Sequence, residues 1–349
     1  MRIGLVAPPW VAVPPPRYGG TEAVLDNLAR GLTALGHAVR LFTVGESTCP
    51  VERQWFFEHA MGTARDAEQE GAHVLAAYES LQDVDIIHDH TVLGPLLASA
   101  GPGRRVPTAF TVHGPVTPPA AAKVLCQASR HAALVAISHA QRRSAPDLPF
   151  FAVIHHGIDL DVYRAGPGGG GYAMFVGRMS PAKGVHRAVT IARRAGMPLV
   201  IAAKMWEPGE VEYYRTAVEP LLDGDVEVLF DTDREARIEL LGRADVLLNP
   251  ICWPEPFGLV MAEALACGTP VVGSPCGAAP EIVEDGVTGF LRESDDDLVD
   301  ALKGIDELDR AEVRHAAVER FSLERMARDH ETLYEQLVAR NVRRRVLIA

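Results

Sequence analysis

Short apolar runs alternate with helical patterns along the whole chain. Most of the runs are nearly continuously apolar, as strands buried on both faces of a parallel sheet are. The predicted strands are 3–7, 39–44, 85–88, 108–112, 134–137, 151–154, 173–176, 199–202, 226–230, 246–249 and 270–273. The predicted helices include 21–35, 184–195, 234–243 and 257–266. This alternation predicts an α/β protein with doubly wound parallel sheets.

A glycine-rich segment near the middle divides this pattern. Residues 166–171 are five glycines and one proline, a composition typical of a flexible linker, and a new strand is predicted just after them. With about six strand candidates on each side, we expect two domains rather than one domain with a long surface loop. The expected boundaries are 1–165 for an N-terminal domain and 172–322 for a C-terminal domain. A final helix over 323–349 has no strand after it.

Composition narrows the possible partners. The 349 residues carry a net charge of −12, which disfavours binding to nucleic acid or to an anionic membrane. The five cysteines are odd in number and have no C-x-x-C spacing, so they indicate free thiols in a reducing cytoplasm. No apolar run is long enough for a membrane span. We therefore expect a cytoplasmic protein with no nucleic-acid partner and no stable membrane insertion.

One strand–loop–helix segment gives the strongest chemical signal. Pro256 suits the first position of a helix, and the free backbone amides of Phe257, Gly258 and Leu259 then point out of the helix start. Such amides form an anion site, and Gly258 allows a phosphate to approach closely. The loop follows a predicted strand, at the sheet edge where open α/β folds bind ligands.

Two carboxylates flank this predicted anion site. Glu255 stands in the loop before the helix, and Glu263 lies further along the helix. They can accept hydrogen bonds from hydroxyl groups on either side of a diphosphate. Two glutamates eight positions apart are common in surface helices, and it is the surrounding Pro-Glu-Pro-Phe-Gly-Leu sequence that makes the pattern specific.

A second strand–turn–helix segment carries two cations. Gly177 and Arg178 directly follow the predicted strand 173–176, and Lys183 follows five residues after Arg178. Arginine offers a fork of donors and lysine a mobile charge, so the two side chains can converge on one anion. The commoner alternative is a pair of exposed cations at a turn. Their place after the first strand of a doubly wound domain favours the anion site.

Three further segments of the first half also follow predicted strands. Gly19 and Gly20 precede a helix and can bring backbone amides close to a ligand. His113 ends one strand and is followed by a glycine, while His90 follows another strand. A single histidine is more often structural than catalytic. His88-Asp89-His90 invites a metal interpretation, but no third ligand is identifiable, and D-x-D occurs too often to be informative. We assign no metal site.

Taken together, these segments resemble the family 4 glycosyltransferases, which are retaining enzymes with the two-domain GT-B fold. The resemblance covers nearly the whole chain, and its motifs occur in the expected order. They are Tyr18-Gly19-Gly20-Thr21-Glu22, Gly157-Ile158-Asp159, Gly177-Arg178 with Lys183-Gly184, Glu255 to Glu263, and Gly286-Val287-Thr288-Gly289-Phe290.

The resemblance implies a fold and a set of roles. Two doubly wound domains would face a cleft, and the final helix would cross back onto the first domain. Arg178 and Lys183 would bind the donor diphosphate, Glu263 the ribose hydroxyls, and Glu255 the hydroxyls of the donor sugar. His113 would lie near the reacting end of that sugar.

The same resemblance implies further roles in the first domain. The Gly19-Gly20 loop would cover the phosphates, and His90 is a candidate on the acceptor side. The donor would be a nucleotide sugar, for which we expect a UDP-sugar, and the acceptor a small molecule or an oligosaccharide. We expect no cofactor.

The chain departs from the family pattern at two places. Ala202-Ala203-Lys204-Met205-Trp206 replaces a glycine-rich turn, which makes Lys204 a candidate nucleotide contact, and His156-Gly157 replaces Asn-Gly. The high content of alanine, arginine and glycine resembles the composition of enzymes from antibiotic oligosaccharide pathways, such as those of the orthosomycins.

Alternative functions remain open from the sequence. They are a nucleotide-sugar epimerase of the same fold, a glycoside phosphorylase, and a non-catalytic nucleotide-sugar binding protein. An NAD enzyme is disfavoured because no G-x-G-x-x-G follows the first strand.

Overall fold

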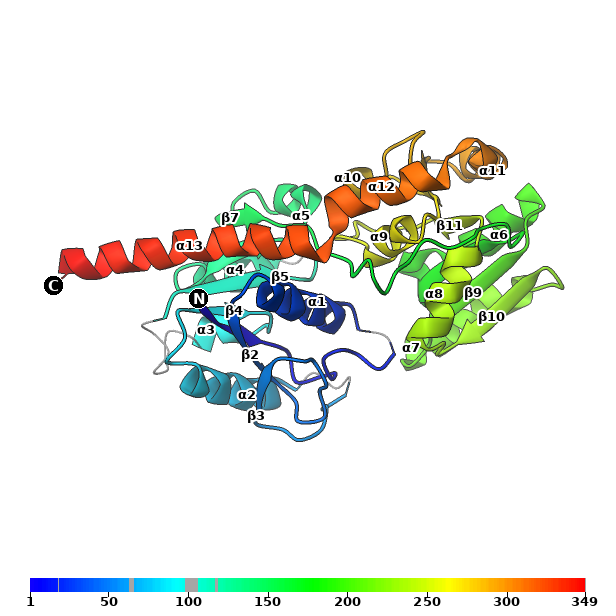
Figure 1. Cartoon of the computed structure of the whole chain (residues 1–349). Coiled ribbons are helices and arrows are strands. Elements are labelled where there is room, and N and C mark those ends of the chain that lie inside the picture. Colours follow the sequence, from blue (N-terminus) through cyan, green and yellow to red (C-terminus); the bar gives the residue numbers. More distant parts are fainter. Residues whose placement is uncertain (18, 63–65, 98–105, 117–118, 349) are drawn as a thin grey trace. The chain divides into compact units, whose positions relative to one another are not determined.

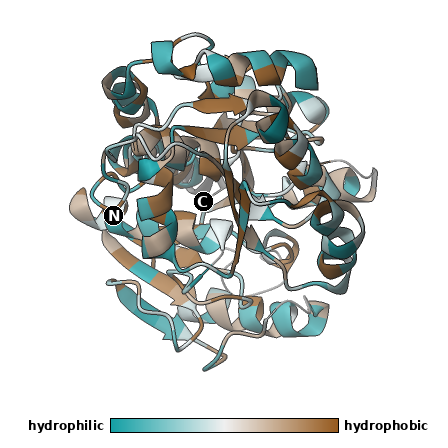
Figure 2. Ribbon diagram, turned by 90° about the vertical axis from the view of Figure 1, so that its right-hand side faces the viewer, coloured by the Kyte–Doolittle hydropathy of each residue, from teal (hydrophilic) through white to brown (hydrophobic). Residues whose placement is uncertain are grey.

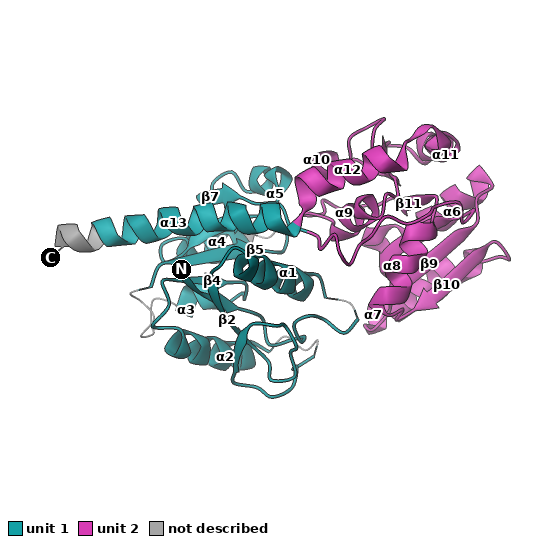
Figure 3. Cartoon of the chain, viewed as in Figure 1, with its two compact units in different colours: residues 1–157, 323–349 teal, residues 158–322 magenta. Residues whose placement is uncertain are grey.

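The computed structural model describes residues 1–17, 19–62, 66–97, 106–116 and 119–348. The chain forms two compact units, one made of residues 1–157 and 323–349 and the other of residues 158–322 (Figure 3). Each unit contains a sheet in which every described strand pair is parallel. The predicted fold class of two doubly wound parallel-sheet α/β domains is therefore confirmed.

The first unit is built on a seven-stranded sheet of order β3-β2-β1-β4-β5-β6-β7 (Figure 1). Its strands are β1 (Arg2–Val6), β2 (Ala38–Thr43), β3 (Glu52–Trp55), β4 (Ile86–Asp89), β5 (Thr108–Val112), β6 (Ala133–Ala136) and β7 (Phe150–Val153). Its helices are α1 (Gly20–Ala34), α2 (Ala67–Ser80), α3 (Gly94–Leu97), α4 (Pro119–Ala128), α5 (His139–Ser144) and α13 (Leu323–Ile348). The central strands β1, β4 and β5 are almost wholly buried, which explains their continuous apolar sequences.

The final helix α13 belongs to the first unit, although it follows the whole of the second unit in sequence. It packs along α1 and also contacts β4. Met326, Ala327 and Tyr334 are buried on the inner face of α13, and Glu331 accepts a hydrogen bond from the His37 ring at 3.0 Å. The helix therefore completes the apolar cover of the first sheet.

The second unit has a six-stranded sheet of order β10-β9-β8-β11-β12-β13. Its strands are β8 (Ala173–Arg178), β9 (Leu199–Lys204), β10 (Val226–Phe230), β11 (Val246–Asn249), β12 (Val271–Gly273) and β13 (Gly289–Leu291). Its α-helices are α6 (Val185–Ala195), α7 (Pro208–Tyr213), α8 (Arg234–Arg243), α9 (Leu259–Ala266), α10 (Ala279–Ile282), α11 (Asp295–Lys303) and α12 (Arg310–Phe321).

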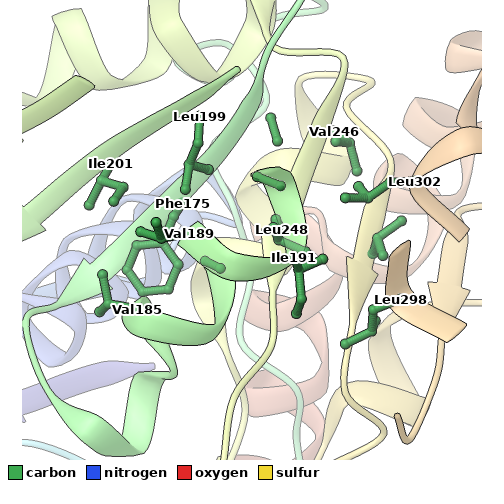
Figure 4. Packing of buried hydrophobic residues seen from close by; sticks show 14 of the residues in the cluster. Phe175, Val185, Val189, Ile191, Leu199, Ile201, Val246, Leu248, Leu298 and Leu302 are labelled. Atoms are coloured by element: carbon green, nitrogen blue, oxygen red, sulfur yellow. The ribbon is translucent and has the colours of Figure 1, made fainter. Parts of the chain in front are cut away.

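The core of the second unit forms where α6 and α11 meet the strands (Figure 4). Val189 and Ile191 of α6 lie in one buried cluster with Phe175 of β8 and Leu298 of α11. Burying one side chain of this size contributes about 1.5–3 kcal/mol of transfer free energy. The ribbon in Figure 2 shows the strands mainly in the hydrophobic colour, whereas the helices mix both colours, as amphipathic helices should.

Two strands escaped prediction from sequence. β3 has the polar sequence Glu-Arg-Gln-Trp and lies at the edge of its sheet, where neither face is fully covered. β13 has only three residues and also lies at an edge. Edge strands lack the continuous apolar pattern by which buried strands are recognised.

The glycine run does not behave as the predicted linker. The boundary between the units falls at Gly157–Ile158, so residues 158–171 belong to the second unit. The run is attached there by backbone hydrogen bonds from Gly166 to Cys267 at 2.9 Å, from Gly168 to Gly242 at 3.0 Å and from Gly170 to Arg243 at 2.9 Å. A side chain at Gly166 would overlap the backbone of Gly242. The glycines therefore serve close packing, and the compact units divide at 157/158, eight residues before the expected end of the first domain at 165.

Candidate functional site

Both sheets reverse their strand order beside the first strand of the unit. In the second unit β8 lies between β9 and β11, and in the first unit β1 lies between β2 and β4. Loops that leave the carboxyl ends of the two inner strands diverge at such a point and leave a crevice for a ligand. Nearly all of the candidate residues lie on loops or strand ends at these places.

Lys183 and Glu255 form an ion pair in the second unit. The Lys183 ammonium contacts Glu255 Oε2, and only 13% and 15% of the two side chains are exposed. Trp253 donates its indole N–H to the same oxygen at 3.1 Å, and its ring centroid lies 5.6 Å from the ammonium. The structure thus brings together Lys183, which the sequence analysis assigned to the donor diphosphate, and Glu255, which it assigned to the donor sugar.

The loops that carry this ion pair are tied to each other. The backbone N–H of Cys252, two residues before Pro254, donates to the Ala182 carbonyl at 2.8 Å. Arg187 of α6 donates to the Pro250 carbonyl at 2.8 Å and pairs with Asp295 of α11. Arg187 was missed from sequence because its partners lie 63 and 108 residues away, and no local pattern distinguishes it from other helix-surface arginines.

Arg178 points to a different carboxylate. Its guanidinium lies 3.8 Å from Oε1 of Glu210, which is 4% exposed. The other oxygen of Glu210 accepts the backbone N–H groups of Trp206 at 2.8 Å and Glu207 at 3.2 Å. Glu210 therefore holds the loop after β9 in place while it also faces Arg178, and sequence analysis missed this role.

Lys204 lies directly beside Arg178. The two residues are paired in register at the carboxyl ends of β9 and β8. The Lys204 ammonium lies 4.2 Å from the ring centroid of Trp206, which is 39% exposed and donates its indole N–H to Asp231 at 2.5 Å. A fixed, exposed aromatic face thus stands next to the two cations.

Helix α9 begins later than the sequence predicted. Its first residue is Leu259, and Gly258 precedes it with φ of +96°, a left-handed conformation that favours glycine. Phe257 lies before the helix and is buried, and its ring packs edge-on against Phe321. The predicted start at Phe257 is therefore wrong, and the amides at the helix start are those of Leu259 and the next residue. Gly177 of β8 lies beside Lys183, since a Cβ at position 177 would be 3.7 Å from Lys183 Cγ.

Glu263 has its own partner on α9. Its carboxylate accepts a hydrogen bond of 2.7 Å from the hydroxyl of Tyr163, which is buried. Burial and the charge of Glu263 raise the pKa of Tyr163, so the phenol stays protonated and can donate. Tyr163 therefore fixes one oxygen of Glu263 and leaves the other for a ligand.

In the first unit, Gly19 and Gly20 lie at the start of α1. The Gly19 carbonyl accepts the N–H of Ala23, and a Cβ at Gly19 would lie 2.7 Å from Glu22 Oε2 and 2.8 Å from Pro15 Cβ. The segment therefore has no room for a side chain at Gly19. Tyr18, which belongs to the same motif, lies outside the described residues.

His90 and His113 meet at the ends of β4 and β5. Nδ1 of His90 lies 2.8 Å from Nε2 of His113. His88, whose side chain is fully buried, contacts Tyr334 of α13 at 2.7 Å and Thr111 of β5 at 2.8 Å. Burial lowers the pKa of His113 to about 3, and burial also holds the pKa values of His88 and His90 well below their usual range. The imidazoles are neutral at pH 7.

The described residues hold no group of three or more histidine, cysteine, aspartate or glutamate side chains arranged to bind a metal ion. Among the same residues, no helix combines the length and the apolar character that a membrane crossing requires.

Two family models match the chain. Residues 18–162 match the model described as Glycosyltransferase Family 4, and residues 165–320 match Glycosyl transferases group 1. Among curated proteins, the alpha-maltose-1-phosphate synthase of Mycobacterium tuberculosis is 37% identical over 192 residues, covering 47% of this chain and 49% of that protein. The D-inositol 3-phosphate glycosyltransferase of Mycolicibacterium smegmatis is 33% identical over 187 residues, covering 47% of this chain and 43% of that protein. The matches thus span about half the length of these relatives.

Solved structures share the fold over nearly the whole chain. AviGT4, a glycosyltransferase involved in avilamycin A biosynthesis, is 28% identical with a TM-score of 0.73, covering 97% of this chain and 98% of that one. Anabaena HepE in complex with UDP and glucose is 20% identical with a TM-score of 0.74, covering 95% of this chain and 99% of that one.

One glycine supports the Glu255 loop, and its substitution tests the geometry. Gly277 has φ of +61°, and a Cβ there would lie 2.2 Å from the Glu255 carbonyl oxygen and 2.4 Å from its nitrogen. Gly286 has φ of +78° but no atom within 4 Å of its Cβ position. Both Gly→Ala changes should cost about 1–2 kcal/mol for the left-handed conformation.

Gly277→Ala should cost about 1–3 kcal/mol more than Gly286→Ala, because the loop around Glu255 must move. Thermal unfolding of the two variants measures the difference, at about 2–4 °C per kcal/mol for a unit of this size. Equal losses of melting temperature would mean that Gly277 does not support the Glu255 loop.

Proposed function

The chain belongs to the group 1 glycosyltransferases with the GT-B fold, and we propose that it is a retaining family 4 enzyme. In this proposal it transfers a sugar from a nucleoside-diphosphate sugar, and specifically a UDP-sugar, to a hydroxyl group of a small-molecule or oligosaccharide acceptor. The two curated relatives are matched over only about half of their length, so the proposed activity rests mainly on the site itself.

The observation that carries the proposal is the charge arrangement at the strand reversal of the second unit. Arg178 ends β8, Lys183 follows in the next loop, and the first amides of α9 lie just beyond Glu255. Two cations and a helix N-terminus at one sheet edge provide the donors that a diphosphate requires. The unit contains more acidic than basic residues, so two cations at one sheet edge contrast with the net charge of the unit as a whole.

The reaction explains why these groups are needed. Breaking the bond between the anomeric carbon and the phosphate oxygen leaves negative charge on the diphosphate and positive charge on the sugar. Lys183, Arg178 and the start of α9 would stabilise the leaving group in place of a metal ion. We propose that the acceptor hydroxyl attacks from the face that the diphosphate leaves, which preserves the configuration of the anomeric carbon.

The remaining donor contacts follow from the neighbouring side chains. Glu263, oriented by Tyr163, offers one carboxylate oxygen to the ribose hydroxyls. The exposed face of Trp206 beside Lys204 offers a stacking surface and a cation for the base. Glu255 would bind hydroxyls of the transferred sugar.

The first unit would serve the acceptor and the reacting sugar. His113 and His90 lie at neighbouring strand ends, and the Gly19-Gly20 segment leaves backbone groups accessible at the start of α1. AviGT4 is a glycosyltransferase involved in avilamycin A biosynthesis. By analogy, we propose an acceptor from an antibiotic oligosaccharide pathway for this chain.

The first test identifies the donor. A thermal-shift screen with UDP-, GDP- and ADP-sugars should show the largest rise in melting temperature for a UDP-sugar, because a ligand that binds only the folded state stabilises it by mass action. Transfer should also persist in EDTA. A larger shift with a GDP- or ADP-sugar would reassign the base, and turnover lost in EDTA and restored by Mg²⁺ would contradict metal independence.

The Lys183–Glu255 ion pair makes a second prediction. Glu255→Gln should strengthen the binding of UDP on the order of 10-fold, because the diphosphate no longer competes with a carboxylate for Lys183. The same variant should lower kcat if Glu255 orients the sugar. Isothermal titration measures the affinity, and Glu239→Gln on the exposed face of α8 is the matched control. Unchanged UDP affinity in Glu255→Gln would show that the two anions do not compete.

The third test separates binding from chemistry. Lys183→Ala and Arg178→Ala should each lower kcat on the order of 100- to 1000-fold, because the charge that they meet grows as the bond breaks. Glu263→Ala should raise KM and leave kcat nearly unchanged, since the ribose does not change charge. Steady-state kinetics decide, with Lys303→Ala on α11 as an exposed control. A loss of kcat in Glu263→Ala as large as that in Lys183→Ala would refute these roles.

A further inference from the structure

Five buried or partly buried imidazoles form a row in the first unit. Their ring centroids are 5.1 Å apart between His330 and His88, 4.1 Å between His88 and His90, 5.1 Å between His90 and His113, and 5.3 Å between His113 and His156. The row begins on α13 and ends at the partly exposed His113 and its neighbour His156. Within the row, His90 and His113, which directly follow β4 and β5, are joined by a hydrogen bond.

The hydrogen bond between His90 and His113 joins two neutral rings. A neutral imidazole carries one N–H and one lone pair, so one of the two rings donates and the other accepts. Either Nδ1 of His90 donates to Nε2 of His113, or Nε2 of His113 donates to Nδ1 of His90. The choice determines which nitrogen of His113 carries the proton.

The second nitrogen of His90 resolves this choice. His90 Nε2 is buried and has no hydrogen-bond partner among the described residues. If His113 were the donor, His90 would carry its proton on Nε2, as a buried N–H with no acceptor. Orphaned N–H groups are rarer in protein interiors than unused acceptors. The favoured arrangement therefore has His90 donating from Nδ1, and Nε2 of His90 as a bare lone pair.

The orientation of the His90 ring is fixed by its contact with the ring of His88. His88 contacts Tyr334 through one ring nitrogen and Thr111 through the other, so its ring cannot turn. The His90 ring lies against it, with centroids 4.1 Å apart. Nδ1 of His90 therefore points to His113 because His88, held by Thr111 of β5 and Tyr334 of α13, keeps the His90 ring in place.

We propose that His90 is a positioning residue that fixes His113 as the Nδ1–H tautomer. His113 then offers an N–H donor from Nδ1, which makes no hydrogen bond to another described residue, and its only lone pair is occupied by His90. In this arrangement His113 donates to an oxygen of a bound substrate and cannot act as a general base. The substrate part of this inference rests on the proposed function, whereas the tautomer does not.

Long-range ¹H–¹⁵N correlation spectra of ¹⁵N-histidine-labelled protein test the tautomer directly. The His113 signals are assigned by their loss in His113→Gln. In the unmodified protein, His113 should carry its proton on Nδ1. In His90→Phe it should shift towards the Nε2–H form that free imidazole side chains prefer. A proton on Nε2 of His113 in the unmodified protein, or an unchanged tautomer in His90→Phe, would overturn the inference.

Kinetics with the nucleotide sugar selected by the donor screen supply a second readout. His90→Phe should lower kcat roughly 10-fold, as loss of a residue that orients a functional histidine typically does. His90→Asn should recover most of this loss, because its amide nitrogen can replace Nδ1 as the donor. Equal losses in the two variants would indicate packing alone and would overturn the positioning role.

The two proposals can fail separately. If no nucleotide sugar is turned over, the proposed glycosyl transfer fails, while the tautomer of His113 is still measured in the resting protein. If His90→Phe does not fold, the unmodified protein and His90→Asn still decide, because both should show His113 protonated on Nδ1. A proton on Nε2 in either would overturn the inference.

Discussion

The direction of the strands is the constraint on which the rest of the structure depends. Every described strand pair in both sheets is parallel, so all strands of a unit end at the same edge. Strand order reverses beside β1 and beside β8, and there the loops diverge. The ends of β8 and β9 therefore carry Arg178 and Lys204, and the ends of β4 and β5 are followed by His90 and His113. Residues far apart in sequence become neighbours because each one lies at the end of a strand or just after it.

In the second unit, the two cations proposed to bind the diphosphate each have a carboxylate nearby. Lys183 contacts Glu255, and Arg178 faces Glu210 at 3.8 Å. Only 13% of the Lys183 side chain is exposed, and its contact with Glu255 offsets part of the cost of removing that charge from water. Under the proposed function, the same carboxylate competes with the diphosphate. Such competition weakens the binding of the nucleotide product and thereby favours its release, whereas the intact donor adds contacts through its sugar.

The sequence predicted the parallel fold and nearly all buried strands, because continuous apolar runs report burial on both faces. It failed at β3, whose polar residues lie at a sheet edge, and at the glycine run, whose composition resembles a linker but whose backbone is bonded to α8 and its surroundings. Local motifs identified Lys183 and Glu255 separately but not the ion pair between them. That pair, like the contacts of Glu210 and Arg187, joins segments that are distant in sequence. Periodicity and motif spacing carry no information on such contacts.

The final helix α13 contributes to the histidine cluster of the first unit, although no motif in its sequence indicated this. From sequence, α13 was only a helix without a following strand, and His88 and His90 suggested a metal-binding pair. In the structure, Tyr334 of α13 contacts His88 across 246 residues of sequence, and His330 of the same helix donates from Nδ1 to the Met326 carbonyl. A carbonyl can only accept, so the tautomer of His330 is determined, and burial lowers its pKa to about 4. A metal ion would need lone pairs that point to one centre, whereas these imidazoles use their nitrogens to hold Tyr334, Thr111 and one another. The histidines are therefore a scaffold that joins α13 to the ends of β4 and β5, and His113, which is partly exposed, keeps Nδ1 available to meet a substrate.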